Sequence, residues 1–248
     1  MPKTKPHARN VNMTTEEHDM WDDLNIEYEN AYRNNPFKKD CIEKAIALLE
    51  PGSRVLDVGC GTGVPVAKML SDAGMDVHGT DVAPQMINHA KASVKGTFEV
   101  ANMVNHQPQG TFDAVFIIFS QLGLTYAEFY VAVHRLAKTL RADGLLIIGQ
   151  ASAEQIVPPQ DDAWDETSSC VEGYNLPFWG QPFPTLMFSR AGQKTFLESM
   201  GFSALYDEVN MFQPDNENCG PEQQQYIIAR RNGDDLVERP TLFPKVTA

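Results

Sequence analysis

The stretch Val55-Leu56-Asp57-Val58-Gly59-Cys60-Gly61-Thr62-Gly63 decides the fold class of this chain. Its first four residues include a short apolar run, which is typical of a parallel strand covered on both faces. The glycines at alternate positions then allow the backbone to approach a ligand where any Cβ would clash. The stretch therefore predicts a buried strand, a nucleotide-binding turn, and a following helix whose first free N–H groups face the ligand.

The spacing of the glycines distinguishes between nucleotide cofactors. A dinucleotide fingerprint has the pattern G-x-G-x-x-G, whose third glycine would fall at position 64, where this chain has Val64. Here the third glycine is Gly63, and Asp57 lies two residues before the first. A carboxylate in that position would repel a pyrophosphate but suits a cationic ammonium or sulfonium. The sequence therefore favours a cationic cofactor over a dinucleotide.

The pattern Asp57-x-Gly59-x-Gly61-x-Gly63 resembles motif I of the class I methyltransferases that use S-adenosylmethionine (SAM). The resemblance implies a Rossmann-like α/β fold with a seven-stranded, mostly parallel sheet, helices on both faces, and a last strand that is an antiparallel hairpin partner. It also implies SAM as the cofactor, with Cys60 and the three glycines at its methionine part.

The rest of the chain alternates between strand and helix patterns, which predicts a parallel sheet with helices on both faces. The expected helices cover 14–49, with a break near Asn35-Pro36, and 62–72, 84–93, 127–140 and 190–200. The strands expected after the first cover 76–81, 97–101, 112–119, 145–149, 202–209 and 225–230. We interpret residues 1–248 as a single domain. It would have a disordered leader at 1–13, a helical lid at 14–50, an aromatic and proline-rich insert at 151–188 after strand five, and a tail at 232–248.

The carboxyl ends of the predicted strands supply the remaining cofactor residues, because ligands of open α/β sheets lie there. Asp81 ends the second strand, 22 residues after Gly59 (81 − 59), and is placed to accept from a ribose diol, with Val82 beside it on the adenine face. By resemblance, Met86 packs near the adenine. Asn102 replaces the usual acid that accepts from the adenine amino group, with the Met103 backbone as an alternative, and Phe119 and Ser120 lie under the methionine moiety.

The acceptor side is less clearly marked in the sequence. Methyl transfer from a sulfonium is an in-line displacement, so the protein mainly aligns the reactants and keeps them dry. In resembling enzymes the N-terminal segment folds over the cofactor, which makes His18 and Tyr28 candidate catalytic residues. The candidates for binding a planar small-molecule acceptor are Trp21, Tyr32, Gln121, Trp164, Tyr174 and Trp179.

Composition narrows the function classes further. The formal net charge is −13 and no basic run occurs, which argues against a nucleic-acid substrate. No apolar run approaches the roughly 20 residues of a membrane span, so a cytoplasmic protein is expected. The predicted ends of strands four and five carry Ser120, Gln121, Gly149 and Gln150 instead of carboxylates, which disfavours a divalent metal.

Three functions remain open on the sequence alone. The first is metal-independent methyl transfer to an N, O, S or C atom of a small molecule. The second is a protein of the same fold that binds SAM without transferring methyl, as a cyclase, an isomerase or a binding partner. The third, which is weaker, is a nicotinamide-dependent oxidoreductase.

Overall fold

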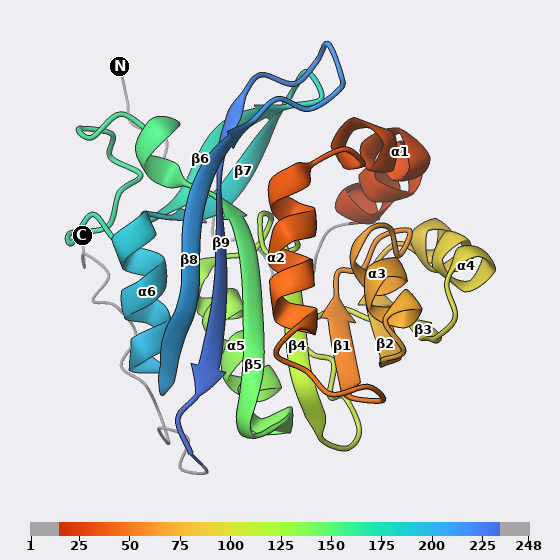
Figure 1. The fold of residues 1–248 in the computed structure, drawn as a ribbon. Coiled ribbons are helices and arrows are strands. Elements are labelled where there is room, and N and C mark those ends of the chain that lie inside the picture. Colours follow the sequence, from red (N-terminus) through yellow and green to blue (C-terminus); the bar gives the residue numbers. More distant parts are fainter. Residues whose placement is uncertain (1–14, 234–248) are drawn as a thin grey trace.

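The structure, a computed structural model, describes residues 15–233, and its main sheet has the strand order β3-β2-β1-β4-β5-β9-β8 (Figure 1). The first five of these strands are parallel, and β9 is antiparallel to both β5 and β8. The strands are β1 (Arg54–Val58), β2 (Asp76–Asp81), β3 (Thr97–Val100), β4 (Phe112–Ile118), β5 (Leu140–Ala151), β8 (Phe202–Phe212) and β9 (Glu222–Arg231). The predicted seven-stranded, mostly parallel sheet is confirmed. The expected leader at 1–13, and the expected tail from 234 onward, lie outside the described residues.

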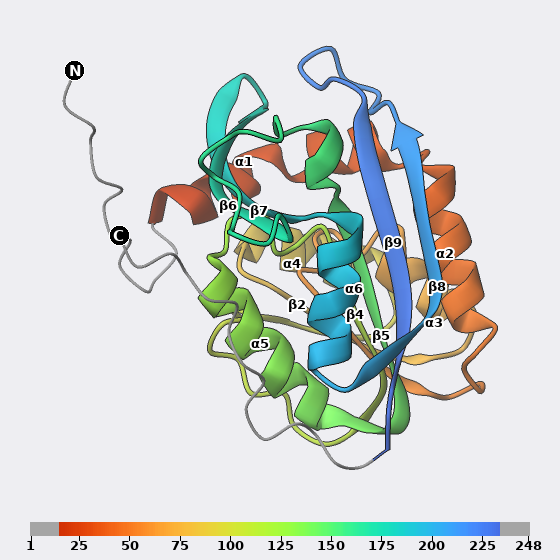
Figure 2. The same cartoon turned by 90° about the vertical axis from the view of Figure 1, so that its left-hand side faces the viewer.

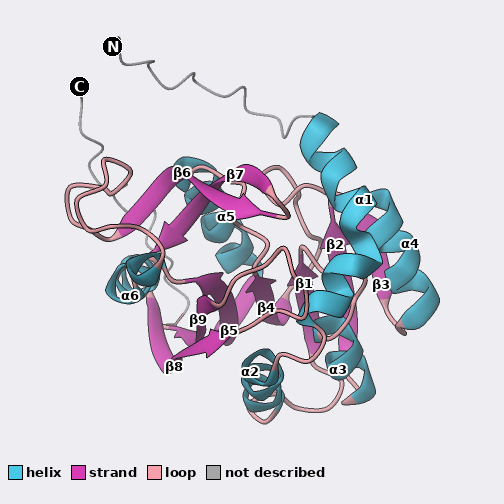
Figure 3. Ribbon diagram, turned by 90° about the horizontal axis from the view of Figure 1, so that it is seen from above, coloured by secondary structure: helices cyan, strands magenta, loops and turns pink. Residues whose placement is uncertain are grey.

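Helices cover both faces of this sheet, as predicted (Figure 3). One face packs against α2 (Pro36–Ile46), α3 (Val66–Asp72) and α4 (Pro84–Ser93), and the other against α5 (Tyr126–Thr139) and α6 (Arg190–Ser199). Strand β4 shows why its sequence is apolar throughout, because Ala114 and Phe116 contact the first layer while Val115 and Ile117 contact the second.

The helix boundaries follow local signals in the sequence. The expected N-terminal helix divides into α1 (Thr15–Tyr32) and α2, and Asn35 caps α2 by accepting from the backbone N–H groups of Phe37 and Lys38. Pro36 is the first helical residue, where its missing N–H is harmless. Helix α5 begins with a capping box between Thr125 and Glu128.

Two predictions about local structure need correction. The first crossover helix, α3, begins at Val66 instead of Thr62, because Pro65 fixes the chain at the cap position and has no N–H to donate. The insert at 151–188 is also more regular than its composition indicated. It contains a short 3-10 turn (Ala153–Gln155) and an antiparallel hairpin of β6 (Cys170–Phe178) and β7 (Gln181–Phe188). Prolines are tolerated in this ribbon because both of its strands are edge strands.

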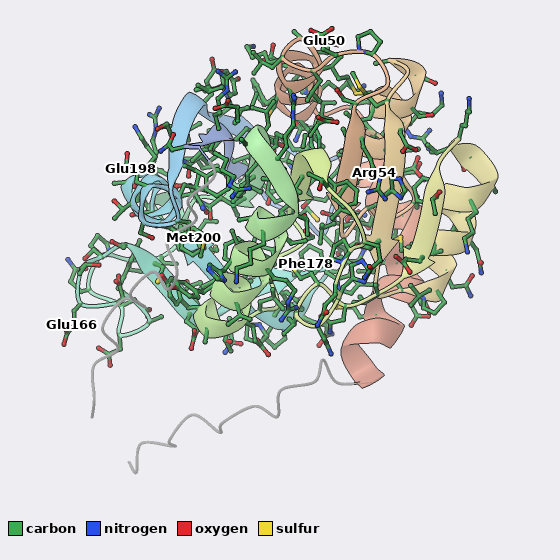
Figure 4. All side chains as sticks on the ribbon, turned by 90° about the horizontal axis from the view of Figure 1, so that it is seen from below. Glu50, Arg54, Glu166, Phe178, Glu198 and Met200 are labelled. Carbon is green, nitrogen blue, oxygen red and sulfur yellow. The ribbon has the colours of Figure 1, made fainter. Side chains whose placement is uncertain are left out.

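Helix α1 and the β6–β7 hairpin stand together over the carboxyl ends of the parallel strands (Figure 2). At the opposite end, Arg54 begins β1 and places its guanidinium 4.4 Å from the centre of the Phe112 ring (Figure 4). None of the helices among residues 15–233 combines the length and apolar character needed to cross a membrane. The fold therefore gathers the glycine turn, the strand ends, α1 and the hairpin at one edge of the sheet.

Truncation of Phe196 tests the layer that joins α6 to α5. Phe196 is fully buried and stacks on Phe129 with ring centres 5.3 Å apart. We expect Phe196→Ala to lower the free energy of unfolding by about 3–5 kcal/mol, through lost burial and a residual cavity. Val131→Ala, at a half-exposed position of the same α5 helix, is the control and should stay within about 0.5 kcal/mol of the parent. Urea unfolding followed by circular dichroism measures both, and equal effects would contradict the packing described.

Candidate cofactor and acceptor site

The glycine turn is held between β2 and the segment that follows β4. The N–H groups of Gly59 and Cys60 donate to the Thr80 carbonyl at 2.7 and 2.9 Å. Gly59 has φ +71°, and a Cβ built on it would lie 2.1 Å from the Cβ of Ser120. Ser120 in turn donates from Oγ to the Val58 carbonyl at 2.7 Å. Only glycine allows β1 and the post-β4 segment to approach this closely.

Asp57 presents a carboxylate oxygen that lacks a partner in the described structure. Its side chain is buried, and Oδ2 makes no hydrogen bond. Burial and the neighbouring Asp81 raise the pKa of Asp57 to about 7, although the nearby Lys38 ammonium acts in the opposite direction. A buried, unpaired carboxylate oxygen is costly, and a cation such as an ammonium would satisfy it.

The carboxylate of Asp81 fixes the turn to the end of β2. Oδ2 accepts from the Gly61 N–H at 2.8 Å, and Oδ1 accepts from the Ala83 N–H at 2.9 Å. Each oxygen keeps a second lone pair that could accept from a ribose hydroxyl. Asn102 is likewise engaged, because its Oδ1 accepts from the Val104 N–H at 2.8 Å.

A single cavity runs from these strand ends to the underside of α1. It is lined by every predicted cofactor residue except Gly63: Asp57, Gly59, Cys60, Gly61, Asp81, Val82, Met86, Asn102, Met103, Phe119 and Ser120. Gly63 faces the other way, and a Cβ there would lie 3.0 Å from Val94 Cγ2 and 3.4 Å from Ala90 Cβ. The third glycine of the motif therefore allows the turn to pack against α4, and it does not line the cavity.

The roof of the cavity is aromatic and comes from α1 and the hairpin. Trp21, Tyr28 and Tyr32 of α1 line it together with Phe183 of β7. The rings of Trp21 and Tyr28 lie 5.5 Å apart, and those of Tyr28 and Tyr32 4.7 Å apart. Within the described part of the chain no hydrogen bond involves the Tyr28 hydroxyl, and burial raises its pKa, so it is a neutral group available to a ligand.

Four of the remaining predicted site residues do not line the cavity. Gln121 is buried and donates from Nε2 to the Gly149 carbonyl of β5 at 3.2 Å. Trp164 and Tyr174 pack against the core on the α2 side of the sheet, and Trp179 lies behind Tyr28. We therefore no longer assign these four residues to the acceptor. His18 belongs to α1, but its side chain lies outside what the structure describes.

Lys38 is the residue that sequence reasoning missed. It lies in the first turn of α2, is buried, and lines the cavity with its Nζ 5.5 Å from the Tyr32 ring centre and 5.6 Å from that of Phe119. Burial lowers its pKa to about 8, against the opposing effect of Glu222 and Asp57. The available signal was helical spacing, because Lys38 shares the buried face of α2 with Cys41, Ile42 and Ala45.

Comparison with known proteins shows what this chain is similar to. Residues 55–144 match the family model described as a methyltransferase domain. This part of the chain is similar to SAM-dependent methyltransferases, as the glycine turn predicts. It is 31% identical over 93 residues to human methyltransferase-like protein 27, covering 35% of this chain and 37% of that one. It is 34% identical over 103 residues to a ubiquinone biosynthesis O-methyltransferase of Dechloromonas aromatica, covering 38% and 43%. The matches thus span about two fifths of these relatives' lengths.

The fold of the chain agrees with that of a solved methyltransferase. Magnesium protoporphyrin IX methyltransferase of Synechocystis, determined with bound SAM, superimposes with a TM-score of 0.59 at 18% identity. The superposition covers 90% of this chain and all of the other. That structure holds SAM, and the unpaired Asp57 oxygen, the buried Lys38 and the glycine turn of this chain fit the charged methionine end of such a cofactor.

Substitution of Gly59 tests the close approach at the turn. We expect Gly59→Ala to weaken binding of S-adenosylhomocysteine (SAH) by roughly tenfold to a hundredfold, because the new Cβ overlaps Ser120 and the left-handed φ strains an L residue. The double variant Gly59→Ala with Ser120→Gly should recover part of the loss, since it removes the nearest clashing atoms. Titration calorimetry measures the affinities, and wild-type affinity in Gly59→Ala would refute the argument.

Proposed function

We propose that this methyltransferase transfers a methyl group from SAM to a small, largely apolar acceptor without the help of a metal ion. The observation that carries the proposal is the continuity of one cavity from Asp57, Gly61 and Asp81 to the aromatic roof formed by Trp21 and Tyr28. Donor and acceptor can therefore meet inside a site that excludes water. The net charge of −13 supports an acceptor other than a nucleic acid.

The charges of the cavity match those of the cofactor's methionine end. In the proposed arrangement, Lys38 pairs with the carboxylate of SAM, and the free Oδ2 of Asp57 accepts from its ammonium. Asp81 receives the ribose hydroxyls, while Met86, Asn102 and Met103 surround the adenine. Lys38 and Asp57 then each have a partner of opposite sign, which no ion pair among the described residues supplies.

The acceptor side holds no strong base among the described residues. Bound SAM would supply an electrophilic methyl group, which an acceptor nucleophile would attack in line while the bond from carbon to sulfur breaks and SAH leaves. The titratable side chains of α1 that line the cavity are Tyr28, Tyr32 and Glu29. Burial raises the pKa of both tyrosines, and the Glu29 carboxylate is already engaged by Arg33 and by Thr62 Oγ1. A neutral phenol orients a nucleophile by hydrogen bonding and takes up a proton poorly. The site therefore favours acceptors that arrive as a neutral amine or an ionised hydroxyl.

The shape of the roof supports a planar acceptor. Trp21, Tyr28 and Phe183 form an apolar wall, against which a ring can stack. Two relatives carry names that refer to ring compounds, ubiquinone and a magnesium porphyrin. The second candidate function, binding of SAM without methyl transfer, predicts an isomerised product with SAM unspent, whereas methyl transfer adds one methyl mass to the product and yields SAH.

The pH dependence of cofactor binding tests the role of Lys38. The charged ammonium binds the carboxylate of SAH, and the pKa of Lys38 in the free protein is lowered to about 8. The contribution of Lys38 to the affinity should therefore be constant below this pKa and fall as the pH rises through it, by up to about tenfold per pH unit, whereas Asp57, whose pKa is about 7, titrates in the wild type and in the Lys38 variants. In Lys38→Arg the guanidinium stays charged over this pH range, so the loss of affinity that comes from deprotonation of the lysine should disappear.

Titration calorimetry between pH 6 and 10 measures the effect. The amine of SAH also titrates, but equally in both proteins, so the difference between wild type and Lys38→Arg isolates the lysine. Lys38→Met should bind about tenfold more weakly at pH 7. Identical pH profiles in wild type and Lys38→Arg would contradict the proposed ion pair.

Substitution of Tyr28 tests the acceptor side. We expect Tyr28→Phe to lower kcat/KM about tenfold with an accepted phenol or amine, because one hydrogen bond to the acceptor is lost, while SAH affinity stays within about twofold. Acceptors are found by incubating the enzyme and SAM with a panel of phenols and amines and recording methylated products by mass spectrometry. Tyr174→Phe, away from the cavity, is the matched control. His18→Ala tests the remaining catalytic candidate in the same assay.

A further inference from the structure

The turn of the β6–β7 hairpin contains an unfavourable backbone conformation. Its two central residues are Trp179, with φ +49°, and Gly180, with φ +73°. Two-residue hairpin turns with both residues at positive φ strongly prefer Asn or Asp at the first position. A bulky side chain there is a genuine outlier. The hairpin itself therefore does not explain why position 179 holds a tryptophan.

The indole of Trp179 contacts α1 as well as the neighbouring ring of Phe178. Its Nε1–H donates to Oε1 of Glu27 at 3.1 Å, and its ring lies 6.0 Å from that of Tyr28. The same Glu27 oxygen accepts from Asn216 Nδ2, in the loop between β8 and β9, at 3.2 Å. One carboxylate on α1 is thus joined to two loops that are distant in sequence.

Among the described side chains, this junction is one of three places where a carboxylate of α1 accepts a hydrogen bond from a segment around the cavity. Asp22 accepts from the Gln85 N–H at the start of α4, at 2.9 Å. Glu29 accepts from Thr62 Oγ1 in the glycine turn, at 2.8 Å. The Glu27 junction is the one beside Tyr28, on the side of the roof formed by the hairpin.

We propose that Trp179 is a positioning residue, which clamps α1 through Glu27 and thereby holds Tyr28 in the roof of the cavity. The clamp explains why a tryptophan occupies a turn position of positive φ, because a long side chain with a donor is needed to reach from the hairpin tip to Glu27. The proposal rests on the proposed function in one respect: α1 is taken as the cover of the SAM and acceptor site. It also reassigns Trp179, which supports the acceptor wall from behind without lining it.

Amide hydrogen exchange of the full chain without ligand tests the clamp. We expect Trp179→Phe and Glu27→Ala each to raise exchange in α1 about fivefold, with no change in α5, because a hydrogen bond to a charged group is lost. Glu27→Gln keeps an oxygen that accepts from both donors and should retain most of the protection. Trp164→Phe is the matched control, since this indole in the same insert donates to the Pro158 carbonyl at 3.0 Å and makes no contact with α1.

A second variant separates the clamp from the stability of the hairpin. Trp179→Asn places a residue suited to positive φ in the turn, so the melting temperature should stay at or above that of Trp179→Phe. Exchange in α1 should nevertheless rise as in Glu27→Ala, and SAH should dissociate about fivefold faster. In the double variant Trp179→Phe with Glu27→Ala, exchange in α1 should be only slightly faster than in Glu27→Ala alone. The additional increase should be smaller than the increase that Trp179→Phe causes in the wild-type background.

The outcomes decide the proposal separately from the enzyme function. Unchanged exchange in α1 for both Trp179→Phe and Glu27→Ala would overturn the clamp. Fully additive effects in the double variant would also overturn it, because the two side chains would then act independently. If the wild-type protein bound no SAH, the proposed function would fail, while the exchange measurements without ligand would still decide whether Trp179 holds α1.

Discussion

The contact between Gly59 and Ser120 is the constraint on which the site depends. Because a glycine with positive φ follows β1, the ends of β1 and β4 approach to a distance that any Cβ would prevent. The same turn leaves Asp57 buried with a free oxygen and directs Phe119 and Ser120 toward the cavity. The glycine turn therefore brings together the residues that face the methionine end of the cofactor.

Buried charge gives this site its selectivity for a zwitterionic cofactor. Lys38, Asp57 and Asp81 all line one cavity. Burial lowers the pKa of Lys38 and raises the pKa of both aspartates, so it disfavours the charged form of all three. A ligand that carries both a carboxylate and an ammonium can relieve these costs together. A dinucleotide pyrophosphate would pair with Lys38 but would meet two carboxylates, which agrees with the distinction that the glycine spacing makes.

The acceptor side is built differently, from elements outside the parallel sheet. Helix α1 and the β6–β7 hairpin meet through aromatic rings, and three carboxylates of α1 join it to α4, the glycine turn and the hairpin tip. Because these contacts are long-range in sequence, the acceptor wall is a product of how the lid and hairpin dock. This division explains why cofactor residues are clustered in sequence, whereas acceptor residues are scattered.

The sequence by itself determined the sheet, its helices and the cofactor side, because apolar periodicity, the glycine turn and strand-end residues such as Asp81 are local signals. Only the tertiary structure decided which aromatic residues face the cavity. Trp164, Tyr174 and Trp179 have the composition of a binding wall, but hairpin pairing turns them elsewhere, and composition carries no register. The sequence did not reveal Lys38 for a related reason, because the buried face of α2 faces the cavity only after the helix packs against the sheet. Burial there lowers the pKa of the lysine and leaves its charge in need of a partner.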